Sequence, residues 1–230
     1  VIAGHAKNIN FHYSKDNSIT IKDDGRGIPV DFHPKYKNKR AFEIVLTTLH
    51  AGGKFSDNVY KTSGGLHGVG ISVVNALSEK LEVKIYHKSK VYSQNYVRGI
   101  PKTKVKIEKC NKSLRGTKVS FVPDKKIFES IFFSPKKLYS FIQMKAVLVK
   151  DTKISFSIDK ELITDKTPHR DKFHYSKGII DFMQNNFSAR KKIIAKDFHA
   201  SLNLNFKEKC EIYISFNTLE QSSLMSYCNT

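Results

Sequence analysis

Two segments of this sequence combine residue types that could bind a nucleotide. The first is Asp23-Asp24-Gly25-Arg26-Gly27-Ile28-Pro29, which follows a run of alternating apolar residues. A carboxylate fixed at the end of a strand can accept a hydrogen bond from an amino group such as the exocyclic amine of adenine, and the glycines let the backbone approach a flat ring closely. Taken alone, this pattern also fits an ordinary Asp/Gly turn.

The second segment is Gly64-Gly65-Leu66-His67-Gly68-Val69-Gly70. Backbone N–H groups of a glycine loop that leads into a helix form a natural anion site, and Lys54 and Lys61 are close enough in sequence to add charge. A Walker A loop is excluded because Ile71 and Ser72 stand where Lys and Ser/Thr are required, and the spacing does not fit a Rossmann loop. The segment therefore predicts another type of phosphate loop, with a flexible glycine-rich surface loop as the alternative.

The periodicity of apolar residues predicts the elements that would hold these segments. Alternation over residues 9–21 predicts a hairpin with a turn at Asp16-Asn17, and a helical period begins at Ala41. Ser134-Pro135 is typical of a helix start. Further strands are expected over residues 81–85, 105–107, 117–121, 154–158, 202–206 and 212–216, and further helices over 73–77 and 179–183.

The middle strands carry lysines at alternate positions, namely Lys84, Lys104, Lys106 and Lys118. This pattern is typical of a sheet with one solvent-exposed face. We therefore expect a two-layer α/β fold in which helices cover one face of a mixed sheet. A basic segment near residue 192 predicts a domain boundary, with residues 1–192 before it and 193–230 after it.

Composition limits the classes of protein to consider. The 230 residues carry 40 Lys+Arg against 21 Asp+Glu, a formal net charge of +19, and 40% are hydrophobic. This excludes wholesale disorder, and no apolar run approaches the roughly 20 residues of a membrane span. The excess is mostly Lys, so it fits either a polyanionic partner or a solvated surface. Three distant cysteines favour a reduced, cytosolic setting over a disulfide or zinc framework. The start at Val1 and the absence of a secretory signal suggest a fragment.

The chain resembles the ATPase region of type IIA topoisomerase B subunits. The resemblance rests on three motifs in this order: D-D-G-R-G-I-P, H-A-G-G-K-F and G-G-L-H-G-V-G. These subunits belong to the GHKL superfamily, named for gyrase, a heat-shock chaperone, histidine kinases and MutL. The resemblance covers essentially the whole chain and includes Gly116-Thr117-x-Val119-x-Phe121. It implies a GHKL (Bergerat) ATPase sandwich over residues 1–192, lacking its N-terminal part, and the beginning of a truncated transducer domain over 193–230.

The resemblance also implies roles for individual residues. Asp23 would hold the adenine amine, residues 27–29 would wall the base with Arg26 at the rim, and Thr117 would complete the contact. Residues 50–60 would form a mobile lid, and residues 65–71 would wrap the triphosphate. The implied nucleotide-binding residues are Asp23, Gly25, Arg26, Gly27, Ile28, Pro29, Lys54, Tyr60, Lys61, Gly65, Leu66, His67, Gly68, Val69, Gly70, Ile71 and Thr117.

The family's catalytic Glu and its magnesium-binding Asn belong to an E-x-x-D-N motif that this chain does not contain. That motif would lie upstream of Val1, so no catalytic residue and no metal ligand are expected here. We expect the stretch by itself to bind nucleotide weakly and not to hydrolyse it, because water activation and charge neutralisation would both be absent.

As a whole, the resemblance implies an ATP- and Mg²⁺-dependent enzyme that passes DNA strands. Its implied partners are DNA and a topoisomerase A subunit in a heterotetramer of two A and two B subunits, with ATP-dependent dimerisation of the B subunits and no membrane. Its implied location is the cytoplasm, associated with the nucleoid. Residues 27–34 and 144–148, together with His87 where gyrases commonly carry Arg, favour decatenating topoisomerase IV over supercoiling gyrase.

Two other interpretations remain. A chaperone or mismatch-repair clamp of the same superfamily fits less well because of H-A-G-G-K-F and the long glycine segment. A basic nucleic-acid-binding module without catalysis would explain the charge of +19 but not the ordered Asp and Gly motifs.

Overall fold

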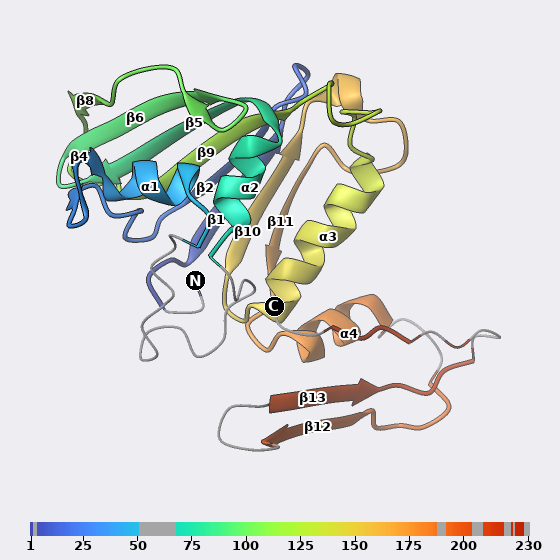
Figure 1. Ribbon diagram of the computed structural model, residues 1–230. Helices are drawn as coiled ribbons and strands as arrows, with labels where there is room; N and C mark the ends of the chain where they lie inside the picture. Colours follow the sequence, from blue (N-terminus) through green and yellow to red (C-terminus); the bar gives the residue numbers. More distant parts are fainter. Residues whose placement is uncertain are drawn as a thin grey trace.

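One large mixed sheet organises the chain, as the computed structural model in Figure 1 shows. The structure describes residues 1, 4–50, 68–187, 192–203, 209–218, 222 and 224–227, with the side chain of Lys37 left aside. The strand order is β11-β10-β1-β2-β9-β5-β6-β7, and β8 also pairs with β6. The pairing of β1 with β10 is parallel, and the other pairings are antiparallel.

The strands of this sheet are β1 (Asn8–Tyr13), β2 (Ile19–Asp23), β5 (Ser78–His87), β6 (Lys90–Val97), β7 (Ile100–Pro101), β8 (Lys106–Lys109), β9 (Gly116–Pro123), β10 (Lys153–Ile158) and β11 (Arg170–His174). Two small sheets stand apart from it, formed by β3 (Phe32–His33) with β4 (Tyr36–Arg40) and by β12 (Phe198–Asn203) with β13 (Lys209–Ile214).

The expected hairpin is confirmed as β1 and β2, in which Tyr13 pairs with Ile19. Its turn is closed by the backbone N–H of Ser18, which donates to Asp16 Oδ1 at 3.0 Å. Asn17 adopts a positive φ of 62°, a conformation that Asn tolerates better than most residues. The hairpin predicted from residues 9–21 is therefore closed by the local preferences of its turn residues Asp16 and Asn17.

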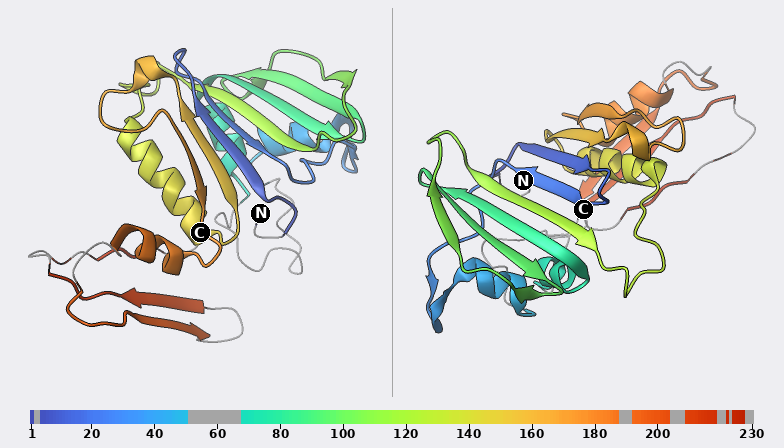
Figure 2. Two further views of the ribbon diagram at one scale, coloured as in Figure 1. Left: turned by 180° about the vertical axis from the view of Figure 1, so that it is seen from behind. Right: turned by 90° about the horizontal axis from the view of Figure 1, so that it is seen from above.

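In the part of the chain that the structure describes, the helices cover one face of the large sheet, so the expected two-layer α/β fold is confirmed (Figure 2). The α-helices are α1 (Ala41–Thr47), α2 (Gly70–Ala76), α3 (Pro135–Leu148) and α4 (Ile179–Phe187), and a 3₁₀ turn, η1, spans Lys160–Leu162. Ser134 is the N-cap of α3, as predicted, and its Oγ accepts from the backbone N–H of Lys137 at 3.4 Å. None of the helices in the described ranges is long and apolar enough to span a membrane.

Two apolar cores lie between the helices and the sheet. The first packs α3 and α4 against β1, β10 and β11, and its largest fully buried side chains include Tyr13 and Phe156. The second packs α1 against β5 and β6 through Phe42, Leu46 and their neighbours. Phe121 of β9 packs against both cores. The central strands β2 and β9 therefore lie where the helix layer changes from one core to the other.

The helix expected from Val73, Val74 and Leu77 is confirmed as α2, but its buried face differs from a purely apolar one. Val74 packs against the second core, whereas Val73 and Leu77 are exposed and Asn75 is fully buried. The cause is a tertiary hydrogen bond: Asn75 Nδ2 donates to the backbone oxygen of Leu46 at 2.9 Å and so turns a polar face of α2 toward α1.

The strands after residue 192 are shifted from their expected ranges. Of the predicted 202–206 strand, the described part ends at Asn203, and Leu204 and Phe206 lie outside the described residues. Phe216, predicted in the last strand, lies beyond the end of β13. Strands β6 and β11 and the short strands β3, β4 and β7 were not predicted.

Candidate functional site

Asp23 is the last residue of strand β2, and two backbone hydrogen bonds orient its carboxylate without filling all its acceptor positions. Its Oδ1 accepts from the backbone N–H of Gly25 at 2.7 Å, and its Oδ2 accepts from the backbone N–H of Thr117 at 3.3 Å. An ionised carboxylate offers about four acceptor positions. Since these are the hydrogen bonds of the Asp23 side chain to the described residues, acceptor capacity remains for a ligand.

The neighbouring Asp24 has a structural role instead. Its Oδ1 accepts from the backbone N–H groups of Lys7 and Asn8, each at 2.9 Å, and its Oδ2 accepts from Asn8 Nδ2 at 2.6 Å. Partial burial opposes ionisation, but these hydrogen bonds outweigh it and hold the pKa of the Asp24 carboxyl below its usual range. Asp24 thus ties the start of β1 to the end of β2, and Asp23 is left as the carboxylate available for recognition.

Three glycines allow tight packing in and around the turn after Asp23, and two of them, Gly25 and Gly116, lie directly against Asp23. A Cβ on Gly116, whose φ is +100°, would lie 2.1 Å from the backbone oxygen of Asp23. A Cβ on Gly25 would lie 2.7 Å from Asp23 Oδ1, and one on Gly27, whose φ is +76°, would lie 3.0 Å from a methyl group of Ile85. These contacts are at or below the closest that real Cβ atoms make, so glycine is required for the backbone to pack this tightly.

Thr117 links the two walls of the site. It is buried on β9, and its hydroxyl oxygen accepts from the backbone N–H of Ile28 at 3.2 Å, while its own N–H donates to Asp23. Thr117 therefore connects the carboxylate to the segment of residues 27–29 that follows it. Ile28 is half-buried and Pro29 is exposed.

The floor beside Asp23 is apolar and was missed from the sequence. Ile21 lies two residues before Asp23 and Val119 two residues after Thr117, so all four side chains share one sheet face. Ile21 and Val119 are paired across β2 and β9. Ile21 is 41% exposed although it lies on the helix-covered face. The i, i+2 spacing in the sequence could have identified both residues as neighbours of the predicted site residues.

A cationic hollow of about 380 Å³ lies next to the site. Arg26 and Gly25 line it, so the structure places Arg26 at the surface beside the glycine turn. Arg115, also missed from the sequence, donates from Nε to the backbone oxygen of Asp24 at 2.6 Å and from Nη2 to that of His5 at 2.8 Å. It therefore fastens the chain start to the beginning of β9.

The second predicted segment reaches the same core as the first. Gly68 has a φ of +62° and Val69 is the N-cap of α2, which begins at Gly70. Ile71 of α2 and Ile28 of the first segment both pack against the core under β5 and β6. Lys54, Tyr60, Lys61, Gly65, Leu66 and His67 lie outside the described residues.

The donor and acceptor set around Asp23 fits a purine amine. The carboxylate accepts, the Thr117 hydroxyl can donate or accept, and Ile21 with Val119 provide a flat apolar surface. By contrast, in the described ranges no group of three or more His, Cys, Asp or Glu is placed to hold a metal ion. The described residues around Asp23 thus fit the base of a nucleotide.

Comparisons with known proteins agree with this chemistry. The family model described as "Histidine kinase-, DNA gyrase B-, and HSP90-like ATPase" matches residues 2–127. The chain is 44% identical over its whole length to the B subunit of DNA topoisomerase 4 of Rickettsia felis and 39% identical to the B subunit of DNA gyrase of Thermotoga maritima, covering 35% and 36% of those proteins. It therefore spans about a third of the length of the curated relatives that it matches.

A solved structure shares the fold. The topoisomerase IV ATP-binding domain of Francisella tularensis, in complex with a small-molecule inhibitor, matches 90% of this chain and 52% of its own with a TM-score of 0.68 and 32% identity.

Proposed function

Since the chain belongs to the family of histidine kinase-, DNA gyrase B- and HSP90-like ATPases, we propose that it is the ATP-binding region of the B subunit of a type II DNA topoisomerase. The observation that carries the proposal is the Asp23 carboxylate, which is oriented by Gly25 and Thr117 and retains acceptor capacity toward the apolar face of Ile21. ATP is the ligand of the ATPase family, and its adenine amine is a donor that the Asp23 carboxylate can accept from.

In this proposal the residues of the chain bind and orient the nucleotide. Asp23 accepts from the adenine amine, Thr117 supplies a hydroxyl beside it, and Ile21 with Val119 support the ring. Residues 27–29 wall the base and Arg26 lies at the rim, while Gly68, Val69, Gly70 and Ile71 contribute the end of the triphosphate loop. Lys54, Tyr60, Lys61, Gly65, Leu66 and His67 complete the proposed contact set.

Mg²⁺ bound with the phosphates of ATP would supply charge neutralisation at the terminal phosphate. ATP binding would close a dimer of B subunits around DNA, and hydrolysis would reopen it. A partner A subunit would cleave the DNA within a heterotetramer of two A and two B subunits, in the cytoplasm and at the nucleoid. Residues 1–192 would form the ATPase part, and residues 193–230 would begin the transducer.

Within the type II enzymes we favour topoisomerase IV over gyrase. The identity of 44% to the topoisomerase 4 relative exceeds the 39% to the gyrase relative. His87, where gyrases commonly carry Arg, lines the cationic hollow beside Arg26. The proposed reaction is therefore decatenation and relaxation of DNA, with gyrase-type supercoiling as the alternative.

The test uses the full-length protein that contains this chain, assembled with its A subunit. We expect ATP-dependent decatenation without negative supercoiling, and an affinity for a non-hydrolysable ATP analogue at least about tenfold above that for the GTP analogue. The physical reason is that guanine presents a carbonyl oxygen where adenine presents its amine, which would leave the Asp23 carboxylate opposed by an acceptor. Salt-dependent DNA binding with no effect of nucleotide would contradict the proposal and favour a basic binding module.

A further inference from the structure

The face of the sheet that the helices leave uncovered carries a continuous row of polar side chains. Directly paired residues of neighbouring strands place their side chains on the same face. One such row crosses eight strands from β11 to β8, and we call it the lysine row. Its members, in spatial order, are Lys172, Ser155, Asn10, Lys22, Lys118, Lys84, Ser93 and Lys106.

The centre of the lysine row places like charges side by side. Lys22 pairs with Lys118, and Lys118 pairs with Lys84, on three adjacent strands. Like charges directly opposite each other destabilise a sheet, so folding alone would favour alternating signs at these positions. The arrangement therefore opposes stability and points to a role in binding.

The carboxylates on this face neutralise only part of the charge. Glu82 pairs with Lys84 at 3.0 Å, and Glu108 pairs with Lys106 at 3.0 Å. Lys22 lies over the ring of Tyr86 at 5.3 Å, which leaves its charge intact. Within the described part of the chain, the ammonium groups of Lys118 and Lys172 have neither a hydrogen bond nor an ion pair.

The surface is hollowed at one end of the lysine row. The depression there has a volume of about 530 Å³, and its lining combines polar and apolar residues, namely Asn10, Phe11, His12, Ser155, Phe156, Ser157, Arg170, Asp171 and Lys172. Its one carboxylate, on Asp171, accepts from the Tyr139 hydroxyl at 2.5 Å. The row and the adjacent row, which runs from Arg170 through Ser157, His12, Thr20 and Ser120 to Glu82 and Asn95, contain no apolar side chain.

We propose that the lysine row is a contact surface for the phosphate backbone of duplex DNA. Lys, Arg, Ser and Asn side chains are the usual phosphate contacts, and interfaces with DNA are more polar and more positive than interfaces with proteins. With strands about 4.8 Å apart, eight strands span roughly 34 Å, close to one helical turn of DNA. Because the row reads no base edges, the contact is independent of DNA sequence.

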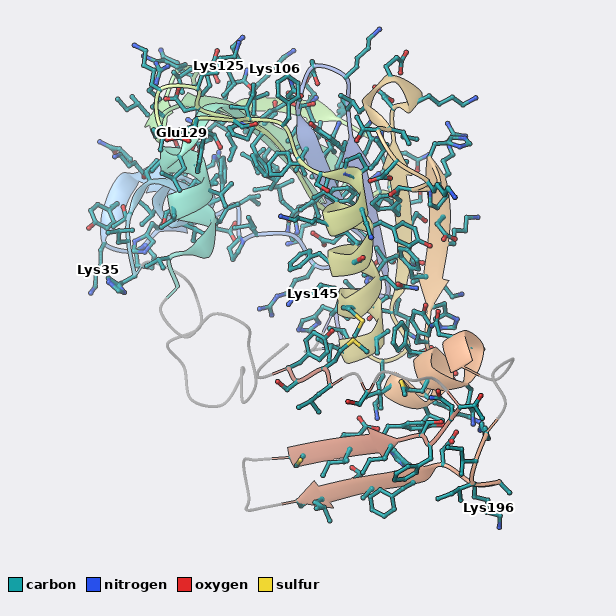
Figure 3. All side chains as sticks on the ribbon, turned by 90° about the vertical axis from the view of Figure 1, so that its right-hand side faces the viewer. Lys35, Lys106, Lys125, Glu129, Lys145 and Lys196 are labelled. Carbon is teal, nitrogen blue, oxygen red and sulfur yellow. The ribbon has the colours of Figure 1, made fainter. Side chains whose placement is uncertain are left out.

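This inference rests on the proposed function for the identity of the polyanion. It adds a DNA contact on the face of the ATPase fold opposite the helices, the Ile21 floor and the nucleotide site. Figure 3 shows Lys106 on the outer side of the sheet, away from α2 and α3, whereas Lys145 lies on α3 and Lys196 near the small sheet.

The experiment compares two triple variants of the full-length protein. The test variant is Lys22→Gln with Lys84→Gln and Lys118→Gln, which removes three charges but keeps most of each side-chain stem. The matched control is Lys35→Gln with Lys145→Gln and Lys196→Gln, which removes three charges away from the row (Figure 3). Affinity for a random-sequence duplex is measured over a series of salt concentrations, and affinity for a non-hydrolysable ATP analogue is measured in parallel.

We expect the test variant to bind duplex DNA at least about tenfold more weakly at 0.1 M salt. Its slope of log affinity against log salt should fall by about 2 to 3, because each lost phosphate contact contributes about 0.9. The control should keep the slope of the parent protein, and neither triple should change the affinity for the ATP analogue. The melting temperature of the test variant should not fall, since like-charge neighbours have been removed.

An unchanged slope in the test variant, or an equal loss in the control, would overturn the proposal. So would displacement of DNA by polyglutamate at equal charge concentration, because the surface would then fit an acidic protein segment. Failure of the parent protein to bind the ATP analogue would instead contradict the proposed function, so the two failures are distinguishable.

Discussion

At the scale of single residues, two adjacent carboxylates have different uses because their donors differ. Asp24 accepts three hydrogen bonds from Lys7 and Asn8, whereas Asp23 accepts one backbone hydrogen bond at each oxygen. The sequence predicted that Asp23 is an acceptor from the motif of residues 23–29, which also contains Asp24. The role of Asp24 could not be read from the sequence, since its donors lie 16 and 17 positions away.

The Thr117 hydroxyl can be tested by a nearly isosteric change. Thr117→Val should leave the backbone N–H of Ile28 without its acceptor, which costs roughly 1–3 kcal/mol of unfolding free energy for a buried group. It should also weaken binding of an ATP analogue by about tenfold, because the wall of residues 27–29 is no longer tied to Asp23. Isothermal titration and chemical denaturation measure the two effects.

Thr20→Val is the matched control, since the Thr20 hydroxyl donates to Ser120 at 2.9 Å on the uncovered face of the sheet. It should leave affinity for the analogue unchanged. Equal losses of affinity in both variants would show that the Thr117 hydroxyl has no specific role at the site.

At the scale of elements, the backbone of β9 packs tightly against the end of β2 at Gly116. Gly116→Ala should destabilise the fold by at least about 2 kcal/mol, because φ is +100° and the added Cβ would lie 2.1 Å from the backbone oxygen of Asp23. Gly70→Ala is the comparison, since its Cβ would meet no atom within 4 Å in the described structure. The unfolding free energy of Gly70→Ala should equal that of the parent protein or be slightly higher. Urea denaturation measures both variants, and similar unfolding free energies for the two would contradict the tight packing at Gly116.

The elements that the sequence predicted are those with local determinants. The hairpin of β1 and β2 has a turn held by Asp16 and Ser18, and α3 begins at a Ser-Pro pair. Strand β6 was not predicted because Gln94 interrupts its buried face. That side chain is 3% exposed, and its Nε2 donates to Glu43 Oε1 at 3.1 Å and to the backbone oxygen of Thr103 at 3.0 Å. These tertiary partners allow a polar residue in a core position and so conceal the alternation.

At the scale of the whole molecule, the small sheet of β12 and β13 has its own electrostatic anchor. Asp197 Oδ2 accepts from Lys192 Nζ at 2.7 Å and from the Tyr213 hydroxyl at 2.5 Å. These two hydrogen bonds, that of Lys192 first, lower the pKa of Asp197 from 3.8 to about 2. A carboxyl whose pKa is lower in the folded state stabilises that state above its unfolded pKa, and the stabilisation disappears as pH falls toward the folded value.

We therefore expect the small sheet to lose stability between about pH 4 and pH 2. NMR signals of Tyr213 should follow a titration with an apparent pKa of about 2. In Asp197→Asn the sheet should be less stable at pH 6, and the Asp197-linked loss below pH 4 should be absent. A titration near 3.8, or an unchanged loss in the variant, would show that Asp197 is not the anchor.

The whole-molecule arrangement was predictable in outline and not in its central detail. Lysines at alternate positions correctly indicated that helices cover one face of the sheet. The adjacency of Lys22, Lys84 and Lys118 depends on the strand order, in which β9 lies between β2 and β5. Alternation within each strand contains no information on that order. By contrast, the place of Ile21 beside Asp23 follows from the i, i+2 spacing within β2 and does not depend on the strand order.

The most direct test of the account is the affinity of the full-length protein for a non-hydrolysable ATP analogue when Asp23 is changed to Asn. The change keeps the shape of the side chain but removes its charge and replaces one of its two acceptor oxygens by an NH₂ donor. A hydrogen bond to a charged group contributes about 1.5–3 kcal/mol, so affinity should fall by about 10- to 150-fold. Asp31→Asn, at an exposed position nearby, should leave it unchanged. Undiminished affinity in Asp23→Asn would contradict the assignment of Asp23 as the residue that recognises adenine.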